Sequence, residues 1–255
     1  MKSPLEKVLA FPLVFGVLSL LIYGFYGVVI GISLVPSAII FWYSAAWLLG
    51  TFSVPHLILF CLITGFSIFV FFLFGLIVFG ITERLLTWGI KPGRYQVGSV
   101  TFIRWMINGG VHTIALNFIL PYMAGTNWIK MHFRLVGCKI GKDVFINSKG
   151  LHDSFLLRLG DNVIIGGDVN ITCHLFEGRT LILDNIVIGD NTLIGAGSYV
   201  MPGARVGQNC SIGAYSIIMK RKRIDDNSVI MPVPGLPMKQ VAKIVKESAR
   251  KSEME

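Results

Sequence analysis

The sequence has no Asp, Glu, Lys or Arg between Lys7 and Glu83, and only 15% of the whole chain is charged. Such an interval excludes an ordinary soluble surface there and is long enough to cross a bilayer more than once. All but two of the 23 Lys and Arg lie beyond residue 83, so the formal charge of +9 belongs almost wholly to the later part of the chain. Because the apolar run does not stop after a short core at a cleavage pattern, we expect a membrane anchor rather than a signal peptide.

Cysteine is scarce as well. The chain has four, at Cys61, Cys138, Cys173 and Cys210, widely spaced and without a CxxC pair. No Cys/His spacing suits zinc, so no metal site is expected. The pattern favours buried thiols in a reducing compartment.

Two apolar runs, residues 9–32 and 54–81, have the length of membrane-spanning helices. Each covers roughly 30 Å of hydrocarbon at about 1.5 Å per residue. Residues 36–50 between them are shorter and interrupted by Pro36, Ser37 and Ser44. This middle segment is open to three interpretations: a third span, a re-entrant helix, or an interfacial helix held by its aromatic side chains.

Basic residues flank both ends of the apolar region, at Lys2 and Lys7 before it and at Arg84, Lys91, Arg94 and Arg104 after it. Basic flanks favour the cytoplasmic side, so both ends should be inside and the number of crossings even. We therefore expect an integral protein of the cell membrane with two spans and its later part in the cytoplasm, three spans being the alternative.

The segment from residue 88 to 125 is rich in residues suited to a lipid headgroup layer, namely Trp88, Lys91, Arg94, Tyr95, Arg104 and Trp105. Residues 112–122 are apolar but too short to span. They fit either a helix lying in the membrane surface or an ordinary core helix. In the second case His112 is a satisfied polar residue and not a ligand.

From residue 140 the sequence has a period of six. Aliphatic residues mark the repeat: Ile140 and Ile146 begin it, Leu159, Ile165 and Ile171 continue it, and a longer run holds phase through Ile182, Ile188, Ile194, Val200, Val206, Ile212, Ile218, Ile224 and Ile230. Gly or Asp often follows the aliphatic residue. One inward aliphatic residue, a short strand and a Gly, Asn or Asp turn are typical of a parallel β-solenoid. A helix is excluded because six is not a multiple of 3.6.

The predicted chain therefore has an α-helical membrane part followed by an all-β parallel β-helix. The expected division is 1–88 for transmembrane helices, 89–138 for interfacial or linker helices, 139–238 for the β-helix, and 239–255 for a charged tail.

The register of the long repeat breaks once. Ile171 and Ile182 are eleven positions apart rather than twelve, and residues 172–179 have poor coil character. A segment should loop out there. Interruptions of a regular solenoid are where function is expected, since the rest of its surface is repetitive.

The units of the form Ile-Gly-Asp-Asn-x-x and the proline-rich exit at 232–237 resemble the hexapeptide-repeat acyltransferases, whose solenoid is a left-handed β-helix. Sugar O-acetyltransferases of that superfamily carry a catalytic histidine in an out-looped segment after a Gly-Asp-Asn-Val coil. Here the coil is 160–163, and the resemblance places the catalytic histidine at His174. Homotrimers, with active sites between neighbouring β-helices, are also an expectation from this superfamily.

A second resemblance extends further towards the N-terminus. Lys91-Pro92-Gly93-Arg94-Tyr95, Phe102-Ile103-Arg104-Trp105, Ala124-Gly125-Thr126 and residues 135–141 look like the membrane-bound tandem domains that end ε-poly-lysine-synthetase-type peptide synthetases. The stretch His174-Leu175-Phe176-Glu177-Gly178-Arg179 is similar to their His-Leu-x-Glu-x-Arg. Glu177 and Arg179 thereby become candidates for substrate binding, and Asn147 and Ser148 fall near substrate contacts of the superfamily.

A histidine with a near-neutral pKa suits the proton transfer that acyl transfer requires. We therefore expect His174 to be the general base. His152 and Asp153 form a second polar cluster, which either orients the acceptor and supports His174 or only ends a loop. No Gly-x-Ser-x-Gly elbow supports a covalent serine route, so direct attack within a ternary complex is expected.

Four consecutive cations, Lys220, Arg221, Lys222 and Arg223, are candidates for donor binding. They suit the phosphates of coenzyme A, an acidic carrier protein, anionic lipid headgroups, or simply a solvated basic face. No bound cofactor is expected; the co-substrate is acyl-coenzyme A or a phosphopantetheinyl carrier protein. A nucleic-acid partner is not supported.

The predicted function is membrane-bound transfer of an acyl or aminoacyl group from a coenzyme A or carrier thioester to an amine or hydroxyl. The alternative is a non-catalytic trimeric membrane scaffold or export channel built on the β-helix.

Overall fold

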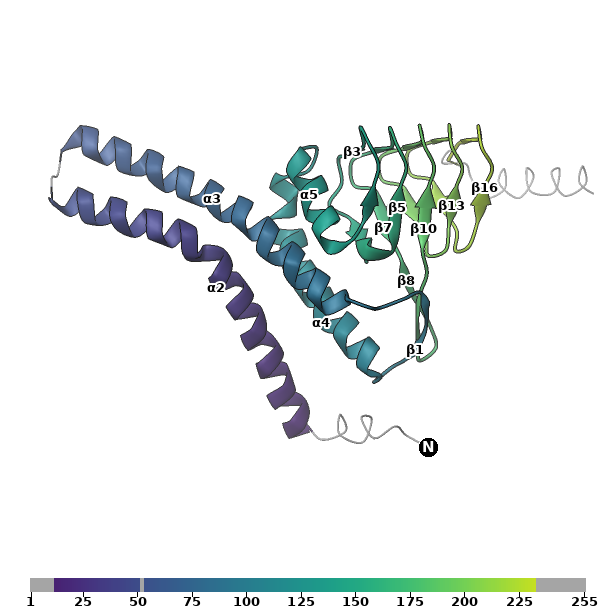
Figure 1. The fold of residues 1–255 in the computed structure, drawn as a ribbon, viewed down its shortest axis with the longest axis horizontal. Helices are drawn as coiled ribbons and strands as arrows, with labels where there is room; N and C mark the ends of the chain where they lie inside the picture. Colours follow the sequence, from purple (N-terminus) through teal and green to yellow (C-terminus); the bar gives the residue numbers. More distant parts are fainter. Residues whose placement is uncertain (1–11, 51–52, 233–255) are drawn as a thin grey trace, which may run out of the picture.

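The computed structural model describes residues 12–50 and 53–232. A hairpin of two long helices, α2 (Pro12–Gly50) and α3 (Val54–Thr87), extends away from a β-helix formed by the later residues (Figure 1). Two shorter helices, α4 (Val100–Phe118) and α5 (Asn127–Val136), lie between the hairpin and the first coils.

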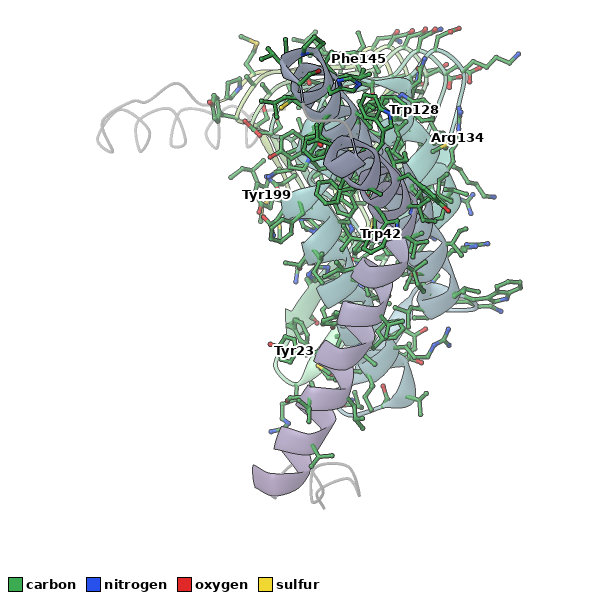
Figure 2. All side chains as sticks on the ribbon, turned by 90° about the vertical axis from the view of Figure 1, so that its left-hand side faces the viewer. Tyr23, Trp42, Trp128, Arg134, Phe145 and Tyr199 are labelled. Carbon is green, nitrogen blue, oxygen red and sulfur yellow. The ribbon has the colours of Figure 1, made fainter. Side chains whose placement is uncertain are left out.

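Both long helices are apolar around their whole circumference, and most of their described side chains are exposed or only partly buried. Stretches Ser19–Leu48 and Val54–Thr87 are long and apolar enough to cross a membrane, with 17% and 6% of the most apolar window buried. Tyr23 and Trp42 of α2, for example, are 71% and 72% exposed (Figure 2). The two helices are therefore compatible with membrane spans.

The segment 36–50 is not a separate element. Helix α2 continues through Pro36 to Gly50 and is bent (Figure 1). A proline removes one backbone donor and bends a helix, which an otherwise continuous apolar helix tolerates. The re-entrant or interfacial segment expected here is the second half of one long helix.

Helix α4 is a core helix. It begins at Val100, where the Ser99 hydroxyl accepts a hydrogen bond from the Phe102 backbone N–H, and it buries Val111, His112 and Ala115. A short 3-10 turn, η1 (Leu120–Tyr122), follows. Residues 112–122 thus pack one face into the core, while Phe118 and Tyr122 on the other face are 65% and 67% exposed. A place for that exposed face in the membrane surface stays a prediction.

Seventeen strands follow α3 within the described residues, and fourteen of them build the coils. The coil strands form three parallel sheets, in the orders β16-β13-β10-β5-β2, β17-β14-β11-β6-β3 and β15-β12-β7-β4. The bounds in the first sheet are β2 Lys139–Ile140, β5 Leu157–Leu159, β10 Ile186–Ile188, β13 Arg205–Val206 and β16 Arg223–Ile224. In the second they are β3 Phe145–Ile146, β6 Ile164–Ile165, β11 Leu193–Ile194, β14 Ser211–Ile212 and β17 Val229–Ile230. In the third they are β4 Leu151–His152, β7 Asn170–Thr172, β12 Tyr199–Val200 and β15 Ile217–Ile218.

The interior of the β-helix uses two residues of each six. The predicted aliphatic position is buried from Ile146 to Ile218, and the position two residues earlier is buried as well. In the later coils that second position holds Thr192, Ser198, Ala204, Cys210 and Ser216. The side chains of Thr192, Ser198 and Cys210 bond to the next coil, as when the Thr192 hydroxyl donates to the Gly207 carbonyl oxygen at 2.9 Å. Such pairing is what makes buried hydroxyls tolerable.

One turn of the repeat has an asparagine in successive coils. Asn162, Asn191, Asn209 and Asn227 all have a positive φ, which asparagine tolerates better than most residues. Their side-chain amides are stacked, and each donates to the next at 3.0–3.2 Å. The repeat is therefore held by side chains as well as by the backbone ladder.

The register break is a β-hairpin. Strands β8 (His174–Glu177) and β9 (Thr180–Leu183) leave the solenoid and form an antiparallel sheet with β1 (Gly93–Gln96). Ile182 belongs to this hairpin, so its prediction as a coil residue is wrong, and the coils resume at Ile186–Ile188. Because β1 closely follows α3 in the chain, the hairpin ties the solenoid to the second long helix.

Candidate active site

His174 is the first residue of the hairpin, and its imidazole contacts the carboxylate of Asp153. The two atoms in contact are Nδ1 of His174 and Oδ2 of Asp153, 2.5 Å apart. The side chain of His174 is 31% exposed and that of Asp153 is 5% exposed. A carboxylate can only accept, so Nδ1 carries a proton, and in the neutral form of the ring Nε2 has the lone pair.

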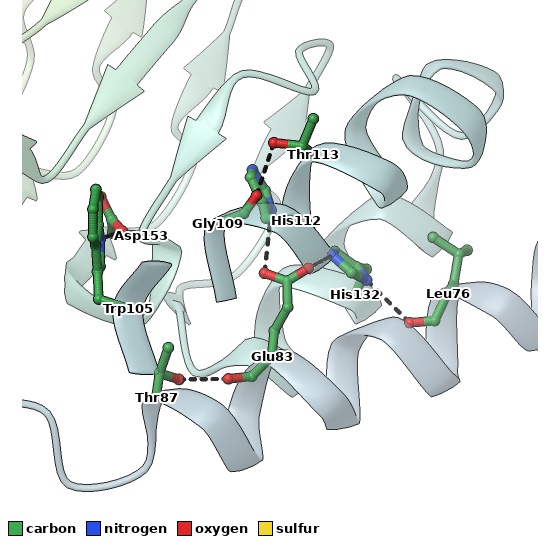
Figure 3. Close-up of polar contacts among 9 residues, drawn as sticks. All are labelled: Leu76, Glu83, Thr87, Trp105, Gly109, His112, Thr113, His132 and Asp153. Atoms are coloured by element: carbon green, nitrogen blue, oxygen red, sulfur yellow. Dashed lines mark hydrogen bonds and ion pairs between the residues drawn. The ribbon is translucent and has the colours of Figure 1, made fainter. Parts of the chain in front are cut away.

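Asp153 is held by the fold around it. It has a left-handed backbone conformation, φ 53° and ψ 41°, at the start of the 3-10 turn η2 (Ser154–Leu156). Its other carboxylate oxygen, Oδ1, accepts the indole N–H of Trp105 on α4 at 2.7 Å (Figure 3). The two oxygens thus bind different partners, which fixes the plane of the carboxylate.

Aromatic side chains cover one side of His174. The Trp105 ring stands edge-on to the imidazole with centroids 4.9 Å apart, and the Phe176 ring lies 5.8 Å from Trp105. Phe102, one helical turn before Trp105, completes the group at 6.3 Å from Phe176. Alternation along a strand puts His174 and Phe176 on one face of β8. This aromatic group consists of Phe102, Trp105 and Phe176.

His152 does not join His174. Its ring lies against that of His112, with centroids 5.3 Å apart. Burial, together with His112 and His174 nearby, lowers the pKa of His152 to about 4, although Asp153 opposes the shift. His152 is therefore neutral near pH 7.

Cys173, next to His174 in sequence, is fully buried. Burial and the neighbouring carboxylates raise the pKa of its thiol well above the usual range. The thiolate is the nucleophilic form of cysteine, so this side chain is chemically inert.

Asn147 and Ser148 lie on the β3 side of the solenoid, away from the hairpin strands. Asn147 is exposed, and its backbone N–H donates to the Ile165 carbonyl oxygen. Ser148 is buried; its hydroxyl donates to the Val169 carbonyl oxygen at 2.7 Å and accepts from the Gly150 N–H at 3.0 Å. Both hydrogen bonds of the Ser148 hydroxyl are therefore used within the solenoid, one to the next coil and one to its own turn.

Glu177, at the end of β8, bridges two basic residues. Its Oε2 lies 3.1 Å from Arg94 of β1, and its Oε1 lies 2.8 Å from Lys220. Hydrogen bonds from Lys220 and Arg94 lower the pKa of Glu177 despite some desolvation. Arg179 is exposed, and its carbonyl oxygen accepts the Val97 N–H. Glu177 fixes the position of the hairpin relative to both β1 and the solenoid.

The four consecutive cations point in different directions. Lys220 binds Glu177, and Arg221 lies 3.5 Å from Asp184, where the chain returns from the hairpin. Lys222 and Arg223 make no ion pair within the described part of the chain. Arg223 and Arg205 line a surface hollow of about 530 Å³ together with Asp225 and Asp226.

Arg223 also belongs to a column of cations. The outward residues of the first sheet, in register from coil to coil, are Lys139, Arg158, Val187, Arg205 and Arg223. All four basic members are exposed. A positive stripe therefore extends along one whole face of the solenoid.

Two residues of the site were not among the site residues predicted from the sequence. Trp105 was expected in a headgroup layer but donates to Asp153, and the Thr172 hydroxyl lies 3.2 Å from Nδ1 of His174. Trp105 ends the stretch Phe102-Ile103-Arg104-Trp105, but the resemblance carried by that stretch gave it no role in the site, and Thr172 belongs to no recognised motif. The contact with Trp105 arises from how α4 packs on the solenoid.

The coils also match known proteins. Residues 185–220 match the family described as bacterial transferase hexapeptide (six repeats). The C-terminal coils are hexapeptide repeats. The matched residues contain the coil strands from β10 to β15.

Two curated proteins are similar in sequence. Delta-poly-L-ornithine synthetase of Acinetobacter baumannii (strain AB307-0294) is 30% identical over 145 residues, which are 56% of this chain and 10% of that protein. A Bacillus subtilis (strain 168) protein named as an acetyltransferase, YvoF, is 26% identical over 89 residues, which are 34% of this chain and 51% of that protein. The chain thus spans about a tenth and about half of these relatives.

Among solved structures, a maltose O-acetyltransferase from Clostridium difficile 630 superposes with a TM-score of 0.42 at 20% identity. The match covers 58% of this chain and 90% of that one. The two curated relatives are named as a synthetase and an acetyltransferase.

Proposed function

We propose that the protein is a membrane-bound acyltransferase that moves an acyl or aminoacyl group from a thioester to an amine or hydroxyl. The observation that carries the proposal is the contact between His174 and Asp153, at the one hairpin that leaves the described coils. The hexapeptide family and the named activities of the sequence relatives support it.

His174 acts as the general base in this proposal. The acceptor gives its N–H or O–H proton to Nε2 of His174 while its nitrogen or oxygen attacks the thioester carbonyl carbon. The C–S bond then breaks, and the thiolate leaves with the proton from the imidazolium. Asp153 holds Nδ1–H and stabilises the imidazolium as it forms. This direct transfer requires no covalent intermediate on the enzyme.

The donor is acyl-coenzyme A or a phosphopantetheinyl carrier protein, each of which brings phosphate groups. Exposed cations, Lys222 and the column that ends at Arg223, offer the complementary charge. Lys220 supports the donor side indirectly, because its ion pair with Glu177 links the basic run to the strand that begins at His174.

Helices α2 and α3 are proposed to cross the cell membrane, with the hexapeptide domain on the cytoplasmic side. Their exposed apolar surface has no partner among the described residues and requires lipid or protein cover. A site tied to α3 through β1 is suited to an amphiphilic or growing acceptor that stays at the membrane.

A trimer of left-handed β-helices is the proposed assembly. The outward column of the second sheet contains Phe145, Ile164, Leu193 and Val229, all of them exposed. Aligned apolar side chains on a solenoid face are suited to contact with a second copy.

Thiol release by the detergent-purified protein tests the function. A panel of acyl-coenzyme A and aminoacyl-carrier thioesters is offered with pooled amines and hydroxyl acceptors, to the unchanged protein and to His174→Ala. His56→Ala serves as the matched control, because His56 lies in the first turn of α3, far from the hairpin. Oligomeric size is measured for all three.

Acceptor-dependent release that falls by roughly 10²- to 10⁴-fold in His174→Ala, but not in His56→Ala, supports the proposal and names the donor class. Release that is indifferent to His174, or no release with any donor, contradicts it. The non-catalytic scaffold or export channel then becomes the better explanation of the fold.

A further inference from the structure

A second polar cluster is buried where three helices meet. Glu83 lies near the end of α3, His112 lies on α4 and His132 on α5 (Figure 3). Their side chains are 2%, 7% and 0% exposed. Isolation of an ionised carboxylate from water costs several kcal/mol unless cations or hydrogen-bond donors replace the water. The Glu83 carboxylate therefore requires a cation or hydrogen-bond donors beside it.

The contacts within the cluster have the spacing of metal ligands. Nδ1 of His112 lies 3.1 Å from Oε2 of Glu83, and Nε2 of His132 lies 3.5 Å from Oε1 of Glu83. One ligand atom from each residue lies within 4.8 Å of the others. Ligands bound tetrahedrally at roughly 2.0–2.1 Å are about 3.3 Å apart. The observed separations bracket that value.

The tautomer of His132 is fixed by the backbone. Its Nδ1 lies 3.0 Å from the carbonyl oxygen of Leu76, which can only accept, so Nδ1 carries a proton. Nε2, on the other side of the ring, faces Glu83. Donation of one ring N–H to a carbonyl while the other nitrogen binds a metal is the usual arrangement of a metal-ligating histidine.

Three buried atoms of the cluster lack a hydrogen-bond partner among the described residues, and one of them is Nε2 of His112, which points away from the carboxylate that Nδ1 contacts. The other two, Nε2 of His132 and Oε1 of Glu83, are unpaired although they face each other. A protonated Nε2 would form a charge-assisted hydrogen bond of about 2.7–2.9 Å. The 3.5 Å separation is too long for that bond and leaves space between two lone pairs for a cation.

Gly80 allows this arrangement. A Cβ at Gly80 would lie 3.3 Å from Nδ1 of His132 and 3.0 Å from Cβ of Leu135. Glycine at this position of α3 therefore permits α5 to approach closely enough for His132 to reach the Leu76 carbonyl.

We propose that Glu83, His112 and His132 bind a divalent transition-metal ion of the Zn²⁺ class. Two imidazole nitrogens and one carboxylate form a ligand set that suits Zn²⁺ and is poor for Mg²⁺ or Ca²⁺, which prefer oxygen. The sequence offered no hint of it, because the three ligands are far apart in the chain and none belongs to a spaced motif.

The ion links the long helix α3 to the site. It joins α3, α4 and α5 at one point, and α4 also carries Trp105, seven residues before His112. That spacing is two helical turns, so both side chains leave α4 on similar sides. A metal at His112 fixes the position from which Trp105 donates to Asp153.

Metal analysis of untagged, detergent-purified protein tests the proposal. The protein is dialysed against a chelator, reloaded with Zn²⁺, freed of excess ion and measured by mass spectrometry. The variants are Glu83→Gln and His132→Asn, with His56→Asn as a matched histidine control. The stripped wild-type protein is also titrated with Co²⁺, whose visible absorption reports tetrahedral coordination.

We expect about one Zn²⁺ per chain in the wild type and in His56→Asn, and much less in the two cluster variants. The Co²⁺ titration of the wild type should give intense visible bands that Zn²⁺ abolishes. Because the Co²⁺ titration uses only the wild-type protein, it tests the proposal even if the variants do not fold. No retained Zn²⁺ together with no such bands overturns the proposal and leaves a protonated network. Neither result depends on whether the protein transfers acyl groups.

Discussion

Single residues decide the chemistry of the hairpin. Asp153 holds one ring nitrogen of His174, Nδ1. The side chain is partly exposed, which leaves the other ring nitrogen, Nε2, for the acceptor. Asp153 in turn binds Trp105, so the orientation of the imidazole depends on a residue from another element. This chain of contacts makes Asp153 the most informative position to change.

Asp153→Asn should lower kcat by roughly 10²- to 10⁴-fold with little change in KM. The amide keeps the shape of the carboxylate but favours the wrong tautomer of His174 and cannot stabilise an imidazolium. Steady-state kinetics on the donor found in the thiol assay measures both constants. Equal kcat values for the variant and the wild type would contradict a role for Asp153 in orienting the base.

The position of the site depends on the secondary-structure elements that hold the β8–β9 hairpin. Strand β1 pairs with β9 of the hairpin. At the end of β8, the Glu177 carboxylate forms ion pairs with Arg94 and Lys220. Exposed ion pairs add little to stability at neutral pH and high salt. They fix the geometry of the hairpin more than they strengthen the fold.

Glu177→Gln should lower the melting temperature slightly at pH 7, and the difference should disappear on acidification. The folded-state pKa of Glu177 is below its ordinary value, so its contribution is present above the unfolded pKa of about 4.3. That contribution is lost as the pH falls through the folded pKa, because the protonated carboxyl no longer binds the two cations. Thermal unfolding from pH 7 to pH 3, at low and high salt, measures the effect. A difference that is constant with pH would show that charge is not involved.

The whole molecule combines an apolar hairpin with a basic solenoid. The long helices extend to one side, and the coils with their cation column form the other part (Figure 1). Basic segments adjoin the apolar helices on the chain, which favours the cytoplasmic side for both ends.

Reporter tags at the two termini should therefore report the same, cytoplasmic side of the membrane, and a tag inserted at residues 51–52 should report the opposite side. Protease protection in sealed vesicles gives the readout. Carbonate washing should leave the protein in the membrane. Opposite locations of the two termini would require three crossings, and release by carbonate would exclude spanning helices.

The sequence by itself determined the repetitive part of the fold. A period of six in aliphatic residues has one economical solution, stacked coils, because only that arrangement buries the residues and pairs every backbone group. The break in that period located the hairpin for the same reason, and the uncharged interval located the two long apolar helices.

Only the tertiary structure decided which polar residues meet. His152 and Asp153 are neighbours in sequence, yet one contacts His112 and the other His174, because a left-handed turn begins at Asp153. Trp105 joins the site, and Glu83, His112 and His132 join each other, through the packing of separate helices. Local patterns record which side chains face inward, but contacts between distant segments depend on how whole elements pack, and a single sequence does not display that.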